Sequence, residues 1–321
     1  MKKITAVLLC FLFLFAIAPG AGAVSLEDGG DALQAIFQKG SAAGLDYRYF
    51  EPELREGQTY PLVIFLHGIA SGNSEGQQLR HYDFYKWASD EFQARFSDAG
   101  GAYLFFPRAP GGWEMITTGT LKKCIDSFLS AHADRIDKTR IYLIGFSVGA
   151  SMTIHMVADY PLLFAAAVPI SAVTQASGEI DKMAQTAVWF FANEKDIYAG
   201  ATASATKKSF DRLRKKTENE DSVRFTRVTQ ALYPDYSKVS NQHYMWRAVS
   251  NDMFMDDRQP YGTSTTYNGA GEELTLTYPY GVISWLSAQT QQNEAKNSQS
   301  FFEKLAAFFR SIFSWLANLF S

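Results

Sequence analysis

A serine between two glycines is the first residue of this chain that could do covalent chemistry. Ser147 lies in Gly145-Phe146-Ser147-Val148-Gly149, between a strand-like segment, 141–144, and a helix-like segment, 150–160. A sharp turn between strand and helix lifts a serine out of the sheet, and the glycines permit the strained backbone and close packing that this turn needs. The pattern therefore predicts that Ser147 is a nucleophile.

A serine hydroxyl needs a base to take its proton, and histidine is the usual base. His155 lies about 12 Å along the helix that begins at Ser147, at ~1.5 Å per residue, so it cannot turn back. If the base comes last in the order serine, acid, histidine, His243 is the candidate that remains. The alternative is that His243 is an ordinary surface histidine. His67 is expected to anchor its own turn, and the other histidines are His81 and His132.

The base must be oriented by a carboxylate that stabilises its charged form. Two acidic residues, Glu194 and Asp196, come just after the apolar run 188–191. Asp196 is the predicted third member, because its place in the loop matches the usual one, and Glu194 is the alternative. A tetrahedral intermediate also needs backbone N–H groups for its oxyanion.

The expected oxyanion donors lie in two turns. The first is Val148, directly after the serine, and the second is Ile69, with Gly68 as the alternative in the turn His67-Gly68-Ile69. Trp246, close after His243, is the predicted substrate-binding residue.

Elements that could position these groups recur along the chain. Short apolar runs predict strands, and helical patterns lie between them, which favours a mostly parallel central sheet with helices on both faces. Ligands of such sheets bind beyond the carboxyl ends of the strands, where both His67 and Ser147 would lie. The expected strands are 45–50, 60–66, 102–106, 141–144, 165–170, 187–191 and 223–228.

The N-terminal 23 residues predict export. Lys2 and Lys3 precede an apolar stretch, 7–18, and small residues up to Ala23, as in a secretory signal peptide; a retained membrane anchor is the alternative. Without that leader, 28 basic residues face 33 acidic ones, a net charge of −5, which does not suggest nucleic-acid binding. Cys10 would leave with the leader, so Cys124 could form no intrachain disulfide. We expect a secreted or cell-envelope protein.

The C-terminal part differs in character. The catalytic domain is expected over 24–290, followed by a polar linker, 291–300, and an amphipathic helix, 301–321. One side of that helix would carry the apolar residues and the other side the charged ones, so it would lie in a membrane interface rather than cross it. The alternative is that it docks on the protein itself or on a second copy.

The motifs together resemble the α/β-hydrolase superfamily, and within it secreted esterases such as polyhydroxybutyrate depolymerases, feruloyl and acetylxylan esterases, and related predicted peptidases. The resemblance covers about residues 47–289 and includes Tyr60 to Gly68, Asp137 to Leu143 before the serine turn, Tyr160 to Ala166, and Ser284 to Gln289. It implies ester hydrolysis through an acyl-enzyme, with Ser147, Asp196 and His243 as the triad and with no metal or organic cofactor.

The chain departs from that family pattern in a few places. Relatives commonly have methionine and glycine where Val148 and Ala150 stand, and often a His-Gly pair where Ala192-Asn193 stands. These changes concern the acyl pocket and hence the substrate. The segment 256–276 is longer than usual and is predicted to cover the site.

We therefore expect an exported serine ester hydrolase that acts on acyl or feruloyl esters, either small molecules or linked to polysaccharide. A serine peptidase of the same fold is one alternative. A non-catalytic envelope protein built on a hydrolase scaffold is another, against which the intact set of three site residues argues.

Overall fold

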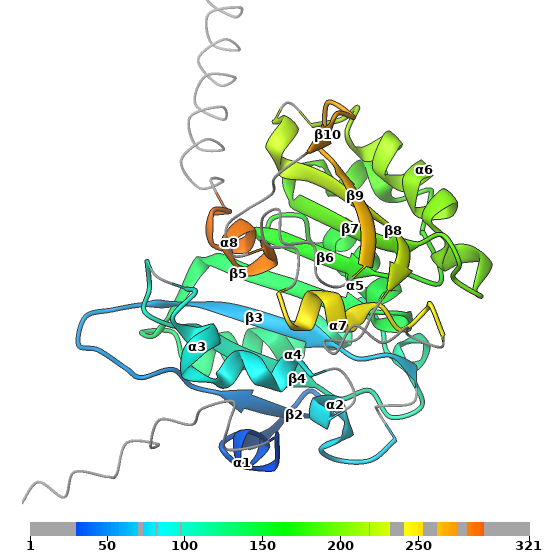
Figure 1. Cartoon of the computed structure of the whole chain (residues 1–321). Coiled ribbons are helices and arrows are strands. Elements are labelled where there is room, and N and C mark those ends of the chain that lie inside the picture. The colour runs from blue at the N-terminus through cyan, green and yellow to red at the C-terminus, as the bar shows by residue number, and fades with distance from the viewer. Residues whose placement is uncertain are drawn as a thin grey trace, which may run out of the picture.

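One mixed sheet organises the part of the chain that the structure describes (Figure 1). The computed structural model describes residues 30–69, 73–80, 83–96, 98–217, 219–231, 241–252, 262–274 and 281–291. Within them ten strands follow the order β1-β2-β4-β3-β5-β6-β7-β8-β9-β10. The strands are β1 Gln38–Ala42, β2 Leu45–Phe50, β3 Tyr60–Leu66, β4 Tyr103–Pro107, β5 Ile136–Phe146, β6 Ala166–Ile170, β7 Ala187–Asn193, β8 Val223–Ala231, β9 Gly262–Tyr267 and β10 Glu273–Leu274.

The middle of the sheet is parallel, as predicted. The six strands from β4 through β3, β5, β6 and β7 to β8 pair with one another in parallel. Every residue of β3, β4, β6 and β7 is buried, which explains their continuous apolar sequences: a strand covered on both faces has no side that needs polar residues. All seven predicted strands are present, with ends that shift by a few residues.

Both edges of the sheet are antiparallel, and their outer strands, β1, β9 and β10, are not among the strands predicted from the sequence. At one edge β1 pairs with β2 through a two-residue turn in which Ala43 has φ 52° and Gly44 has φ 80°. At the other edge β9 pairs with β8 and β10 with β9. The described part of 256–276 thus extends the sheet edge, whereas we expected a cover over the site.

Helices lie on both faces, which confirms the predicted layers. The helices of the first face are α4 Thr118–Ala131, α5 Val148–Asp159 and α6 Ala203–Leu213, whose apolar residues share one core with Leu62 and Ile64 of β3. A second core lies on the opposite face, around Val63 and Phe65. The helices that contribute to it or lie beside it are α1 Gly30–Ala35, α2 Gln77–Arg80, α3 Asp90–Gln93, α7 Trp246–Ser250 and α8 Gly281–Ser287.

A buried carboxylate joins three elements of the second face. Asp252, which is 0% exposed, accepts hydrogen bonds at Oδ1 from the N–H groups of Val282 (2.6 Å) and Ile283 (3.1 Å) at the start of α8. Its Oδ2 pairs with Arg95 at 3.0 Å. Burial raises the pKa of Asp252 to about 6, although the Arg95 charge and these hydrogen bonds oppose the rise.

The predicted leader, most of the linker and the C-terminal amphipathic helix lie outside the described residues, so these three predictions stay predictions. Among the helices that the structure does describe, none is long and apolar enough to cross a membrane.

Candidate active site

The turn at Ser147 has the geometry that the sequence predicted. It joins the end of β5 to the start of α5, and Ser147 has φ 57° and ψ −120°, a conformation that side-chain-bearing residues rarely adopt. Such strain costs about 1–3 kcal/mol and persists only where the surroundings enforce it. Here the Ser147 N–H donates to the carbonyl of Ile170 on β6 at 3.0 Å, which ties the turn to the neighbouring strand.

The two glycines of the turn, Gly145 and Gly149, lie where the neighbouring backbone leaves no room for a Cβ atom. A Cβ on Gly145 would lie 2.3 Å from the carbonyl oxygen of Gly149, inside the first turn of α5. A Cβ on Gly149 would lie 2.3 Å from the oxygen of Leu66 and 2.5 Å from that of His67. The start of α5 therefore rests directly on the backbone that leaves β3, and this contact brings the two predicted oxyanion turns together.

The structure brings the three predicted catalytic side chains into one hydrogen-bonded chain. His243 Nε2 lies 2.9 Å from Ser147 Oγ, and His243 Nδ1 lies 2.7 Å from Asp196 Oδ2. The exposed fractions are 7% for Ser147, 2% for His243 and 8% for Asp196. An Nδ1–H that donates to the carboxylate leaves the Nε2 lone pair free to accept the serine proton.

Asp196 and Glu194 occupy different environments. Asp196 Oδ1 accepts a hydrogen bond from the Tyr198 N–H at 2.9 Å, so both carboxylate oxygens have partners inside the site. Glu194 is instead paired with Arg227 at 3.2 Å, and both side chains are 40% exposed. The geometry thus favours Asp196, the first choice from the sequence, as the partner of His243.

Asn193, at one of the positions where the chain departs from the family pattern, connects the two loops of the site. It is 0% exposed at the end of β7. Its Oδ1 accepts from the Lys195 N–H at 2.8 Å and shapes the loop that carries Asp196. Its Nδ2 donates to Gln242 Oε1 at 2.8 Å, one residue before His243. From the sequence, this departure is expected to alter the acyl pocket; in the structure, the contacts of Asn193 hold the acid loop against the histidine loop.

Aromatic rings surround the His243 imidazole. The Phe146 ring centroid is 4.9 Å away and the Tyr198 ring, which meets it edge-on, is 4.6 Å away. The ring of Trp246, the predicted substrate-binding residue, lies 4.7 Å from that of Phe146, and Trp246 is 7% exposed. Its described aromatic contacts are with Phe146 and Tyr244, so a role in substrate binding stays a prediction.

His67 is a structural residue of the loop after β3, as expected. Its Nδ1–H donates to the carbonyl of Gly68 at 2.7 Å, and its Nε2 accepts from the Ala109 N–H at 3.0 Å. Burial lowers its pKa to about 4, so the ring is neutral near pH 7. The Trp113 indole N–H donates to the His67 carbonyl at 2.7 Å. Ile69, at the end of this fixed loop, is 58% exposed.

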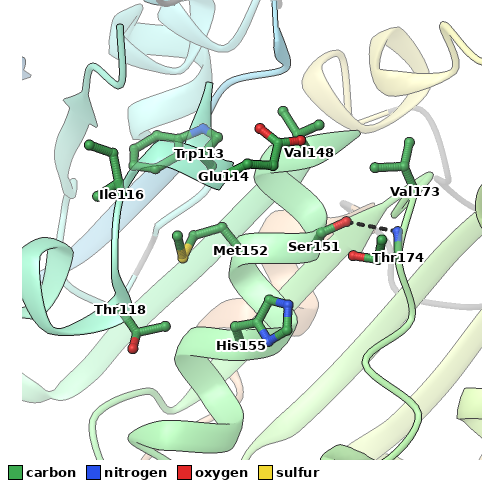
Figure 2. Close-up of a pocket in the computed structure, with 10 residues that line it drawn as sticks. All are labelled: Trp113, Glu114, Ile116, Thr118, Val148, Ser151, Met152, His155, Val173 and Thr174. Carbon is green, nitrogen blue, oxygen red and sulfur yellow. Dashed lines mark hydrogen bonds between the residues drawn. The ribbon is translucent and has the colours of Figure 1, made fainter. Parts of the chain in front are cut away.

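A hollow of about 260 Å³ lies beside the serine turn, on the face covered by α4 and α5 (Figure 2). Val148, the residue after Ser147, lines one end of it. Figure 2 shows Trp113 and Ile116 on one side of the hollow and Val173 and Thr174 on the other. The hollow could not be predicted from the sequence, because its walls come from three separate segments. The ten lining residues are Trp113, Glu114, Ile116, Thr118, Val148, Ser151, Met152, His155, Val173 and Thr174.

The sheet order, the strained serine turn and the position of the histidine after β8 are those of an α/β-hydrolase fold, and the chain has that fold. Comparison with solved structures agrees. A thermostable esterase has a TM-score of 0.60 and 20% identity, with 80% of this chain and 64% of the esterase chain covered. An acetyl xylan esterase from Aspergillus awamori has a TM-score of only 0.42 and 16% identity, with 55% and 79% covered. The first likeness shows the fold, and the second is too weak to argue from.

Sequence comparison finds one depolymerase. Poly(3-hydroxyalkanoate) depolymerase C of Paucimonas lemoignei is 31% identical over 127 residues, a match that covers 35% of this chain and 27% of the depolymerase. The chain thus matches about a quarter of the length of that relative. No family model matches the chain.

Proposed function

We propose that the protein is a serine carboxylic ester hydrolase that works through an acyl-enzyme. The observation that carries this proposal is the continuous chain from Ser147 Oγ through His243 to Asp196, with contacts of 2.9 and 2.7 Å. A serine in a strained turn, an imidazole within hydrogen-bond reach and a buried carboxylate behind it are the parts of a nucleophilic triad.

In the first half-reaction the Ser147 oxygen attacks the ester carbonyl carbon while its proton passes to His243 Nε2. The backbone N–H of Val148, the first residue of α5, has no partner within its own helix and can donate to the oxyanion. The N–H of Ile69 is the proposed second donor, with Gly68 as the alternative. Protonated His243, held by Asp196, then gives its proton to the departing alcohol. Water reverses the sequence, releasing the acid and restoring the serine.

The rim of the site supports an uncharged, partly apolar substrate. Four exposed large apolar side chains lie on the loops that carry the proposed catalytic groups, with exposed fractions from 41% to 67%. Such side chains offer favourable contacts to apolar parts of a ligand. They are Ile69, Ile197, Tyr198 and Tyr244.

Two further parts of the proposal rest on the sequence. Residues 1–23 direct export, so that the enzyme acts in the cell envelope or outside the cell, on esters that include acyl or feruloyl groups linked to polysaccharide. Residues 301–321 attach it peripherally to membranes. N-terminal sequencing of the protein from its host tests the first idea, with Val24 expected as the first residue. Flotation with liposomes, compared for the whole chain and a chain ending at Gln289, tests the second.

Hydrolysis of p-nitrophenyl acetate beside a peptide anilide tests the activity itself. We expect turnover of the ester, little turnover of the anilide, and loss of ester turnover in Ser147→Ala with an unchanged circular dichroism spectrum. A preference for the anilide would make the protein a peptidase. Equal activity of the wild type and Ser147→Ala would remove the proposed site.

A further inference from the structure

The loop after β6, residues 171–179, contacts both the helix that follows the proposed nucleophile and the loop of the proposed acid. It begins at Ser171, which is 0% exposed, has φ 52° and donates its N–H to the carbonyl of Phe191 on β7 at 2.9 Å. A residue with a side chain keeps such a strained backbone only where its surroundings enforce it. The start of this loop is therefore fixed against the sheet.

One part of the loop is bonded to α5. The Thr174 N–H donates to Ser151 Oγ at 3.0 Å, as the dashed line in Figure 2 shows. Ser151 lies one turn along α5 from Ser147, and its own N–H donates to the Ser147 carbonyl at 3.1 Å. The loop after β6 is thus attached to the first turn of the helix that positions the nucleophile.

Another part of the loop lies against the acid loop. A backbone bridge between Asn193 and Thr202 closes the acid loop at its base. Gly200 lies near the end of that loop, four residues after Asp196. A Cβ on Gly200 would lie 1.9 Å from the carbonyl oxygen of Val173. Backbone therefore touches backbone where the two loops meet, and a side chain has no room there.

The side-chain amide of Gln175 holds the two loops together. Its Nε2 donates to the carbonyl of Gly200 at 2.8 Å and to that of Ala172, in its own loop, at 3.0 Å. Carbonyl oxygens only accept hydrogen bonds, so these two contacts fix which end of the amide is the nitrogen. On α6, Thr206 Oγ1 lies 3.2 Å from Nε2, and the Ser209 hydroxyl donates to Oε1 at 2.9 Å. One half-buried amide thus connects the loop after β6, the acid loop and α6.

The acid loop is held at both ends by side-chain amides. Asn193 holds its beginning against the histidine loop, and Gln175 holds its end at Gly200. Between these two points the side chains of Ile197 and Tyr198 are exposed, so their burial contributes little to the position of the loop. The hydrogen bonds at the two ends therefore have a large part in determining where the acid lies.

Building on the proposed function, we propose that Gln175 is a positioning residue: by fixing Gly200 to the loop after β6, it keeps Asp196 in place. Asp196 Oδ2 lies 2.7 Å from His243 Nδ1, and this bond orients the imidazole toward the serine. Without the bond from Gln175 the end of the acid loop can move, and small displacements of a catalytic group lower the rate by about 10- to 100-fold.

The first experiment separates the bond to the acid loop from the bonds to α6. Gln175→Met keeps the length of the side chain and removes all of its hydrogen bonds, whereas the control Ser209→Ala removes one bond to α6 and leaves the bond to Gly200. Both variants should lower the urea concentration at the midpoint of unfolding, because each removes a hydrogen bond that is at least partly buried.

The kinetics should differ between these two variants. We expect Gln175→Met to lower kcat for p-nitrophenyl acetate about tenfold or more, and to change KM by less than about threefold because both half-reactions use the same triad. Ser209→Ala should keep kcat within about twofold of the wild type. Titration of Ser147 with a fluorophosphonate counts the active sites, so that kcat refers to folded enzyme.

The second experiment asks whether the effect passes through the acid. In an Asp196→Asn background the function of the acid is already lost, so Gln175→Met should lower the remaining Ser147-dependent rate by less than about twofold. A residue that only stabilised the fold would lower the rate by the same factor in both backgrounds. Gly200→Ala tests the same contact without removing a hydrogen bond, because its Cβ pushes the acid loop away from Val173. It too should lower kcat, and only when Asp196 is present.

The outcomes separate this inference from the proposed function. If p-nitrophenyl acetate is hydrolysed in a Ser147-dependent way but Gln175→Met keeps the wild-type kcat per titrated site, the hydrolase stands and the positioning role is wrong. The role is also wrong if Gln175→Met and Ser209→Ala lower kcat equally, or if the loss is the same with and without Asp196. Absence of any Ser147-dependent hydrolysis removes the proposed function itself.

Discussion

The side-chain amide of Asn193 donates to Oε1 of Gln242 at 2.8 Å, and this bond joins the loop of the proposed catalytic acid to the loop of the proposed base. The two residues are 49 positions apart in the chain. Asp196 and His243 therefore do not rely on their own hydrogen bond alone to stay aligned.

We expect Asn193→Ala to lower kcat by about 10- to 100-fold, because small displacements of a catalytic group cost that much. It should also reduce the free energy of unfolding by about 1–3 kcal/mol, since Gln242 and the Lys195 N–H lose a buried partner. Steady-state kinetics and urea unfolding measure the two effects. Asn219→Ala is the matched control: Asn219 Oδ1 also accepts a backbone N–H two residues on, but at an exposed site before β8. Equal kinetics of the two variants would contradict the positioning role.

The choice between the two acidic residues can be tested directly. Asp196→Asn should lower kcat roughly 10³- to 10⁴-fold, because an amide holds the wrong tautomer of His243 and cannot stabilise its charged form. Glu194→Gln should leave kcat within about twofold, since an exposed pair such as Glu194–Arg227 contributes little. The reverse result would move the acid role to Glu194.

The lack of space around Gly149 in the serine turn gives a further prediction. In Gly149→Ala the new Cβ would meet the carbonyl oxygens of Leu66 and His67 at 2.3 and 2.5 Å, so α5 must move away from the loop after β3. We expect a loss of about 1–3 kcal/mol in unfolding free energy and a fall in kcat, because the two oxyanion donors would separate. Gly178→Ala, where nothing lies within 4 Å of the new Cβ, is the control and should change neither quantity. Unaltered kinetics in Gly149→Ala would count against an oxyanion hole between these turns.

Two buried groups should make stability depend on pH in opposite directions. The pKa of Asp252 is raised by burial from 3.8 to about 6, so the folded state holds its proton more tightly and stability falls as pH rises through this window. The pKa of His67 is lowered by burial from 6.5 to about 4, so stability falls as pH drops through that window. Each effect amounts to roughly 3 kcal/mol at ~1.4 kcal/mol per pH unit, and the two nearly cancel.

Urea unfolding between pH 4 and pH 7 of the wild type, Asp252→Asn and His67→Gln checks this cancellation. The stability of the wild type relative to Asp252→Asn should decrease as pH rises, and its stability relative to His67→Gln should increase. Slopes of the same sign for both differences would refute the assignment.

The sequence predicted the buried central strands, but it did not predict the edge strand β1. Continuous apolar runs such as 60–66 located the central strands, because burial on both faces leaves no other pattern. The edge strand β1 has mostly exposed residues, QKGSA, and carries no apolar signal, so it was missed. Its pairing with β2 depends on the Ala43-Gly44 turn, which the composition of 24–43 did not suggest.

In the site, spacing and strand ends were enough to choose Ser147, His243 and Asp196, and the structure brings these residues together. The contact of Asn193 with Gln242 and the ring of Tyr198 against His243 arise from loops that meet only in the folded protein. One of these contacts had a local signal in the sequence. Aspartate in turns commonly accepts a hydrogen bond from the backbone N–H two residues later, and for Asp196 that residue is Tyr198. The hollow along α5 had no such signal.

Cys124 lies 0% exposed in the core between α4 and the sheet, and burial raises the pKa of its thiol to about 12. A thiol reagent therefore reaches the sulfur only when α4 separates from the strands beneath it, and reacts with the thiolate that forms on contact with water. In a chain that begins at Val24 this is the sole cysteine. The rate at which a chromogenic disulfide labels that chain thus reports how often α4 separates from the sheet, and no cysteine has to be introduced.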